Sequence, residues 1–88
     1  MSVKDWIEET LTRALDPTDL RVDDESHLHA GHGGWRPSGE THFRINVVSE
    51  AFAGKSRVER HRIVNGHLEP AFERGLHALA ISAKAPGE

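Results

Sequence analysis

The clearest secondary-structure signal in this sequence is the stretch THFRINVVS, residues 41–49. Apolar and polar side chains alternate along it, which is typical of a β-strand because successive residues point to opposite faces. The apolar face holds Phe43, Ile45 and Val47, and the polar face holds His42, Arg44 and Asn46. One apolar and one polar face predict an antiparallel sheet that other elements cover on a single side.

Upstream of this strand, the pattern predicts a helix and a shorter strand. Residues 2–15 place apolar side chains at helical intervals, with Ser2 as the N-cap, and the pair Asp16-Pro17 ends the helix. Residues 19–25, DLRVDDE, alternate more weakly, and we expect a short edge strand there. The first half of the chain is therefore predicted to form one helix followed by a two-stranded hairpin.

Downstream, a turn over residues 50–54 precedes a helix that is expected over residues 57–67. We expect Phe52 in that turn to fill the core and Ser56 to cap the helix. Pro70 is expected to break this helix or to open a second one, because proline suits the first turn of a helix.

The last predicted element is a strand over residues 77–83, after a helix C-cap at Gly75. One face of this strand is predicted to hold His77, Leu79, Ile81 and Ala83. The expected order is α-β-β-α-α-β. This order predicts one α+β domain over residues 1–88, with helices covering a three-stranded sheet.

Length and composition exclude several classes of protein. The chain has 88 residues, no cysteine, seven histidines and a formal net charge of −3. Without cysteine it forms no disulfide, thiolate metal site or nucleophilic thiol. No run approaches the roughly 20 apolar residues that cross a bilayer, and residues 1–11 lack the apolar core of a signal peptide. We therefore expect a cytoplasmic protein with no membrane partner and, because no catalytic motif is present, no enzyme activity.

Residues 27–40, HLHAGHGGWRPSGE, carry no helical or strand period and contain His27, His29 and His32. Loops longer than about 12–15 residues are uncommon in compact domains and are usually functional or disordered. Neutral imidazole is a good ligand for iron, zinc and copper. The pattern leaves two interpretations open: a solvated loop or a metal-binding loop. In the second case the loop could bind a single metal ion by itself, without a partner protein.

Four cations precede or lie on the helix expected over residues 57–67: Lys55, Arg57, Arg60 and Arg62. They predict either a solvated helix face or a surface for an acidic partner, for glutathione or for nucleic-acid phosphates. The net negative charge and the lack of a G-x-x-G clamp disfavour nucleic acid. A nucleic-acid-binding transcriptional regulator that uses residues 55–67 is therefore the alternative function, with DNA as its partner.

Two blocks of sequence, together with shorter matches, resemble the BolA family. The matching segments are FAGKSRVERHRIVN at residues 52–65, Leu68, GLHAL at residues 75–79, Pro86, Glu25-Ser26 and ETHF at residues 40–43. The resemblance extends over about residues 2–86.

The resemblance implies a fold similar to class II KH domains, with the order α-β-β-α-α-β. It also implies a non-enzymatic accessory protein that pairs with a monothiol glutaredoxin around a shared [2Fe–2S] cluster and serves iron–sulfur maturation or iron regulation. In such a pair, the glutaredoxin cysteine and glutathione bind one iron. The histidine of the HAL motif, here His77, and a histidine between the first two strands bind the other.

Alignment from Glu25-Ser26 assigns that second ligand to His29, with His27 and His32 within reach as substitutes. Since this chain has no cysteine, any sulfur ligand of the cluster must come from the partner.

The three remaining histidines receive other interpretations. His61 lies on the apolar face of its predicted helix and is expected to be a packed core residue, whereas His42 and His67 are expected at the surface. The free protein is expected to be a monomer or a weak homodimer.

Overall fold

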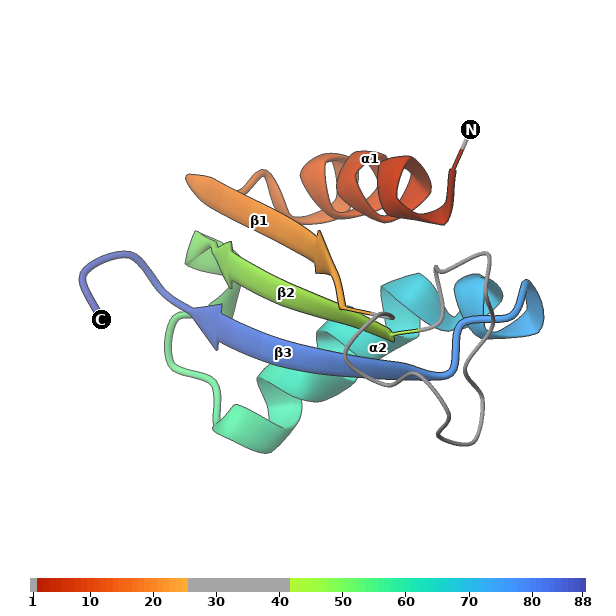
Figure 1. Ribbon diagram of the computed structural model, residues 1–88. Helices are drawn as coiled ribbons and strands as arrows, with labels where there is room; N and C mark the ends of the chain where they lie inside the picture. Colours follow the sequence, from red (N-terminus) through yellow and green to blue (C-terminus); the bar gives the residue numbers. More distant parts are fainter. Residues whose placement is uncertain (1, 26–41) are drawn as a thin grey trace.

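The computed structural model describes residues 2–25 and 42–88 of the chain (Figure 1). Along the chain the elements are the helix α1 (Val3–Leu15), the strands β1 (Asp19–Asp24) and β2 (His42–Val48), the 3-10 turn η2 (Glu50–Phe52), the helix α2 (Arg57–Glu73) and the strand β3 (Ala78–Lys84). The expected α+β class with a three-stranded sheet is confirmed. The similarity to class II KH domains stays a prediction. No helix in the described ranges is long and apolar enough to cross a membrane.

β2 is the central strand of a mixed sheet with the order β1-β2-β3. It pairs antiparallel with β1, where Asp24 lies opposite Phe43, and parallel with β3, where His42 lies opposite Ala78. The expectation of an antiparallel sheet is therefore wrong for β3. The physical reason is that α2 carries the chain back to the end at which β2 begins, and such a crossover joins parallel strands.

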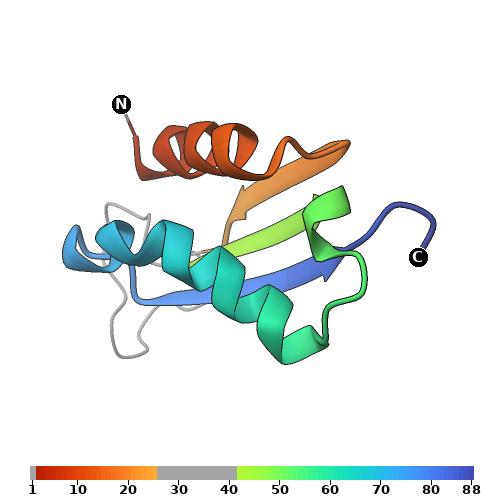
Figure 2. The same ribbon diagram turned by 180° about the vertical axis from the view of Figure 1, so that it is seen from behind.

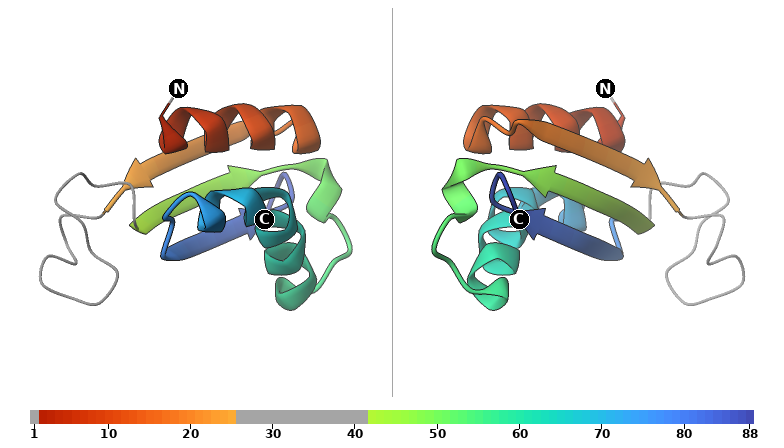
Figure 3. Two further views of the ribbon diagram at one scale, coloured as in Figure 1. Left: turned by 90° about the vertical axis from the view of Figure 1, so that its right-hand side faces the viewer. Right: turned by 90° about the vertical axis from the view of Figure 1, so that its left-hand side faces the viewer.

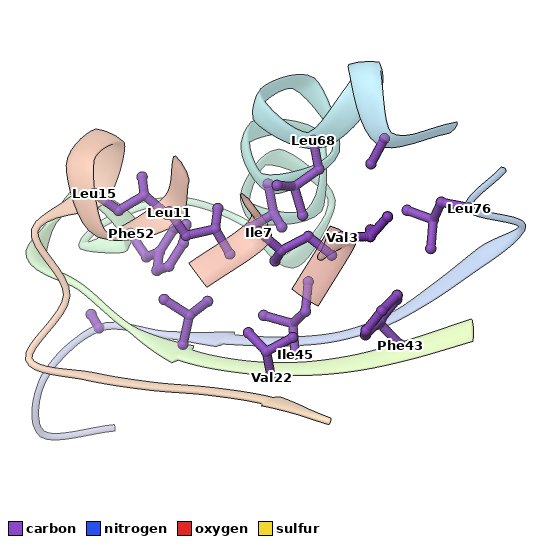
Figure 4. Packing of buried hydrophobic residues seen from close by; sticks show 14 residues of the cluster. Val3, Ile7, Leu11, Leu15, Val22, Phe43, Ile45, Phe52, Leu68 and Leu76 are labelled. Carbon is purple, nitrogen blue, oxygen red and sulfur yellow. The ribbon is translucent and has the colours of Figure 1, made fainter. Parts of the chain in front are cut away.

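Both helices cover one face of the sheet, and the core fills the space between the two layers (Figure 2, Figure 4). α1 packs against β1, α2 packs against β3, and the two helices also contact each other (Figure 3). The buried apolar side chains are Val3, Ile7, Leu11, Leu15, Val22, Phe43, Ile45, Val47, Phe52, Val64, Leu68, Ala71, Leu76 and Ala85. The predicted apolar face of β2 and the predicted core position of Phe52 are confirmed.

α2 is one helix that continues through Pro70, so the expected break and second helix are wrong. A proline inside a helix costs about 3 kcal/mol, because it has no N–H to donate and its ring crowds the carbonyl four residues before it. Leu68 and Ala71, on either side of Pro70, are fully buried in the core. We infer that the packing of this last turn outweighs the local preference of proline.

The helix ends follow their sequence signals. The hydroxyl of Ser2 accepts a hydrogen bond from the backbone N–H of Asp5 at 3.0 Å. Ser56 and Glu59 form a capping box at the start of α2, in which each side chain accepts the backbone N–H of the other residue. Gly75, just beyond α2, has a φ of 106°, which favours glycine and turns the chain toward β3.

Candidate functional site

β1 ends at the same end of the sheet at which β2 and β3 begin (Figure 1). This arrangement follows from the topology, because β1 is antiparallel to β2 and β3 is parallel to it. His42 opens β2, and His77 directly precedes β3. The topology therefore brings together two histidines that are far apart in the sequence.

The backbone at His77 is held on both sides. Leu76 donates its backbone N–H to the carbonyl of Ala71 at 3.1 Å, and its side chain is buried in the core. Ala78 is paired with His42 at the start of β3. The side chain of His77 is exposed, so its imidazole projects from a constrained stretch of backbone and is accessible to a ligand or a partner.

His42 is buried, with an exposed fraction of 7%, so its expected place at the surface is wrong. Its ring lies against the ring of His77, with centroids 5.2 Å apart and planes inclined by 53°. A separation and tilt in this range are typical of packed aromatic rings. Sequence reasoning missed the pair because the contact depends on the parallel register of β2 and β3, which no local pattern reveals.

An ion pair lies at the same end of the sheet. The Nε of Arg44 donates to Oε2 of Glu25 at 3.1 Å, and the backbone N–H of Glu25 donates to the carbonyl of His42 at 2.8 Å. A hollow of about 160 Å³ is lined by these three residues together with Phe43, Ala78, Leu79 and Ala80. These bonds tie the end of β1 to the start of β2 and restrain the backbone of His42.

The predicted loop ligands His27, His29 and His32 lie outside the described residues. Within residues 2–25 and 42–88, no group of three or more His, Asp or Glu side chains is placed to hold a metal ion. Among the described residues, the imidazole that lies against the predicted ligand His77 is that of His42. The assignments of His77 and His29 as ligands stay predictions.

The predicted basic surface forms part of a groove of about 690 Å³ between the start of α2 and β3. Its lining includes five cationic side chains, those of Arg44, Lys55, Arg57, Arg60 and Lys84, and the carboxylate of Glu88. Arg62 is exposed and does not line it. Lys55, Arg57 and Lys84 form no ion pair with any carboxylate of the described residues, so their charges are available to an anionic ligand.

Arg60 differs from the other cations of the groove. Its side chain is 13% exposed, and its guanidinium donates to both carboxylate oxygens of Glu88 and to the carbonyl of Ala83. The hydrogen bonds that Arg60 donates to the Glu88 carboxylate raise the pKa of Arg60. Because its charge is neutralised within the chain, Arg60 acts first as a structural residue, unlike Lys55 and Arg57.

The remaining histidines lie on α2. His61 is half-buried and lines the basic groove, so its expected place as a packed core residue is wrong. His67 is exposed, as predicted.

Comparison with known proteins places this architecture in a family. The family model described as BolA-like protein matches residues 11–88. The uncharacterized protein of the cobS 5′ region in Sinorhizobium is 51% identical over 89 residues, which cover 100% of this chain and 96% of that protein. SufE-like protein 1, chloroplastic/mitochondrial, of Arabidopsis thaliana is 50% identical over 86 residues, which cover 93% of this chain and only 23% of that protein.

A solved structure agrees with the sequence comparisons. The BolA domain of SufE1 from Arabidopsis thaliana matches with a TM-score of 0.88 and 48% identity, over 98% of this chain and 94% of that chain. The family model extends over the end of α1, the whole sheet and α2, and therefore over both His42 and His77. The chain belongs to the BolA-like family.

Proposed function

We propose that this chain is a non-enzymatic accessory protein that binds a monothiol glutaredoxin and shares a [2Fe–2S] cluster with it, in iron–sulfur assembly and trafficking or in iron regulation. The observation that carries the proposal is the placement of His77. Its imidazole is exposed, yet the backbone beneath it is fixed between the buried Leu76 and the first residue of β3. A ligand for an iron held mostly by another protein needs both access and a constrained position.

The donor set fits such a cluster. Neutral imidazole is a good iron ligand, and replacement of cysteine by histidine raises the reduction potential of a [2Fe–2S] centre. This chain has no cysteine, so the thiolates would come from the glutaredoxin and from glutathione. The chain would contribute imidazole nitrogens, and because protons compete with metal for those nitrogens, its hold on the cluster would weaken at acidic pH.

The second histidine ligand is proposed to be His29, with His27 and His32 as substitutes. Glu25 and His42, the described residues that border this part of the chain, both lie at the His77 end of the sheet and are joined by a backbone hydrogen bond of 2.8 Å. The chain therefore leaves the sheet and returns to it beside the proposed ligand.

The proposal is tested by reconstituting a [2Fe–2S] cluster on a monothiol glutaredoxin with glutathione, with and without this protein. We expect a change in visible absorption and circular dichroism that is lost with His77→Ala. His29→Ala, His27→Ala and His32→Ala identify the loop ligand, and His67→Ala, at an exposed position of α2, is the matched control. A spectrum that is unchanged by the protein, or indifferent to His77→Ala, would exclude the proposed function.

A second candidate, binding of DNA phosphates, is favoured by the basic groove with its three cations that lack an ion pair among the described residues. Each phosphate neutralised by the protein contributes about −0.9 to the slope of log K against log salt concentration. If the groove binds duplex DNA, the double variant Lys55→Gln, Arg57→Gln should weaken binding and make this slope less steep by about 2. Absence of a complex at low salt would remove this candidate.

A further inference from the structure

We propose that His42 is a positioning residue for His77: its buried ring holds the exposed imidazole of His77 in the orientation that presents a nitrogen to the partner-held iron. The inference rests on the proposed function, but its structural basis is the ring contact itself. It assigns a role to a histidine that sequence reasoning placed at the surface.

The first argument is the contrast in burial between the two rings. His42 is 7% exposed, whereas His77 is exposed. The buried ring of His42 is held in place by the atoms packed around it. Without a contact, an exposed ring such as that of His77 would exchange between rotamers on the picosecond-to-nanosecond timescale. In a contact with centroids 5.2 Å apart, the buried ring therefore limits the rotamers of the exposed one.

The second argument is that the backbone of His42 is restrained on both edges. β2 is the central strand, so His42 has Ala78 of β3 on one side. On the other side, its carbonyl accepts the backbone N–H of Glu25 at 2.8 Å. Glu25 is in turn tied to Arg44 by an ion pair of 3.1 Å. The backbone of His42 is therefore restrained on both sides, and its ring is buried, so His77 packs against a fixed support.

The third argument comes from the energetics of metal ligation. Residues that orient a histidine ligand, without touching the metal, commonly account for a 10–100-fold change in metal affinity. The backbone of His77 is already held by Leu76 and Ala78. What remains to be fixed is the rotation of its side chain, and within the described residues the ring of His42 is the aromatic contact that restricts it.

The test compares two substitutions at position 42 in the intact protein. His42→Phe keeps a ring of similar shape and removes both nitrogens, whereas His42→Ala removes the ring. The apparent affinity for cluster-loaded monothiol glutaredoxin is followed by visible circular dichroism. We expect His42→Ala to weaken this affinity about 10–100-fold and His42→Phe to stay close to wild type. His67→Ala controls for the loss of a histidine elsewhere.

Two outcomes of the affinity measurement would overturn the proposal. If His42→Ala binds like wild type, the ring contact has no role in positioning. If His42→Phe is as weak as His42→Ala, a nitrogen of His42 is needed. If His42 is itself a ligand, pulsed electron paramagnetic resonance of the reduced cluster would then show that both variants have lost a histidine nitrogen coupling.

A measurement on the cluster-free protein separates this inference from the proposed function, and its wild-type part does not depend on whether the variants fold. Three-bond couplings of the His77 side chain in the wild-type protein should report one dominant χ1 rotamer. Averaged couplings would overturn the inference even if the cluster is shared. A single rotamer, retained in His42→Phe and lost in His42→Ala, would support it even if no cluster forms with a glutaredoxin.

Discussion

The guanidinium of Arg60 donates to both carboxylate oxygens of Glu88, at 2.5 and 2.8 Å. The same carboxylate accepts the backbone N–H of Ala85 at 3.1 Å, and the guanidinium also donates to the carbonyl of Ala83 at 3.2 Å. A bidentate ion pair of this kind is geometrically specific, because the N–H donors of the planar guanidinium are spaced to meet both oxygens of a carboxylate. It joins the first turns of α2 to the segment that follows β3, and both residues line the basic groove.

This pair predicts a pH dependence of stability. The hydrogen bonds from Arg60, followed by that from Ala85, lower the pKa of Glu88 from 4.5 to about 2. A carboxylate whose pKa is lower in the folded state contributes its full stability above its unfolded pKa, and this contribution is lost as the pH falls through the folded pKa. The difference in melting temperature between wild type and Glu88→Gln should therefore be constant near neutral pH and shrink between pH 4.5 and 2.

Differential scanning calorimetry across this pH range measures that difference. Glu73→Gln, which removes one carboxylate from an exposed position of α2, controls for the general effect of charge. A difference between wild type and Glu88→Gln that is the same at pH 2 and pH 7 would contradict the stabilising role of the pair.

The second prediction concerns the fully buried Phe52, whose ring comes from η2 and fills the core beneath α1 (Figure 4). Phe52→Ala removes this ring and leaves a cavity, so the free energy of unfolding should fall by about 3–5 kcal/mol. Urea denaturation measures the change. Val58→Ala, at a residue of α2 that is 58% exposed, is the control and should alter stability by no more than about 0.5 kcal/mol. Equal effects of the two substitutions would rule out the core position of Phe52.

The third prediction concerns the capping box of α2. The hydroxyl of Ser56 accepts the backbone N–H of Glu59 at 3.1 Å, which satisfies a donor that the helix leaves unpaired. Ser56→Ala should lower the free energy of unfolding by about 0.5–2 kcal/mol. Ser56→Asp should retain most of the stability, because aspartate is an equally good N-cap. If the aspartate variant is as unstable as the alanine variant, the cap is not the source of the loss.

The fourth prediction is that replacement of Pro70 stabilises the protein. Pro70 lies inside α2, where it cannot donate to the carbonyl of Gly66. Alanine restores that donor, so Pro70→Ala should raise the free energy of unfolding by roughly 1–3 kcal/mol, less the small entropic advantage of proline in the unfolded chain. Guanidinium denaturation measures it, with Glu69→Ala at the neighbouring exposed position as the control. Lower stability of Pro70→Ala would mean that the proline itself is required.

Local patterns in the sequence were sufficient for most elements of the fold. Alternation along residues 42–48 identified the central strand, and serine at the two caps identified the starts of both helices. These signals succeed because they depend on the pleat of a strand or on the unpaired donors of one helical turn, and both are properties of short segments. Pro70 misled the prediction, because its local cost is overcome by the burial of Leu68 and Ala71 in a core that sequence spacing does not reveal.

By itself, the sequence determined the α+β class, the strand and helix starts and the core position of Phe52. Through the blocks at residues 52–65 and 75–79, it also determined the family resemblance that the comparisons confirmed. Only the tertiary structure decided which side chains meet. The parallel pairing of β2 with β3 places His42 against His77, and the crossing of α2 over the sheet brings Arg60 to Glu88. Both contacts join residues that are remote in the chain. Their geometry depends on strand direction and helix placement, which are set by packing of the whole core rather than by any local run of residues.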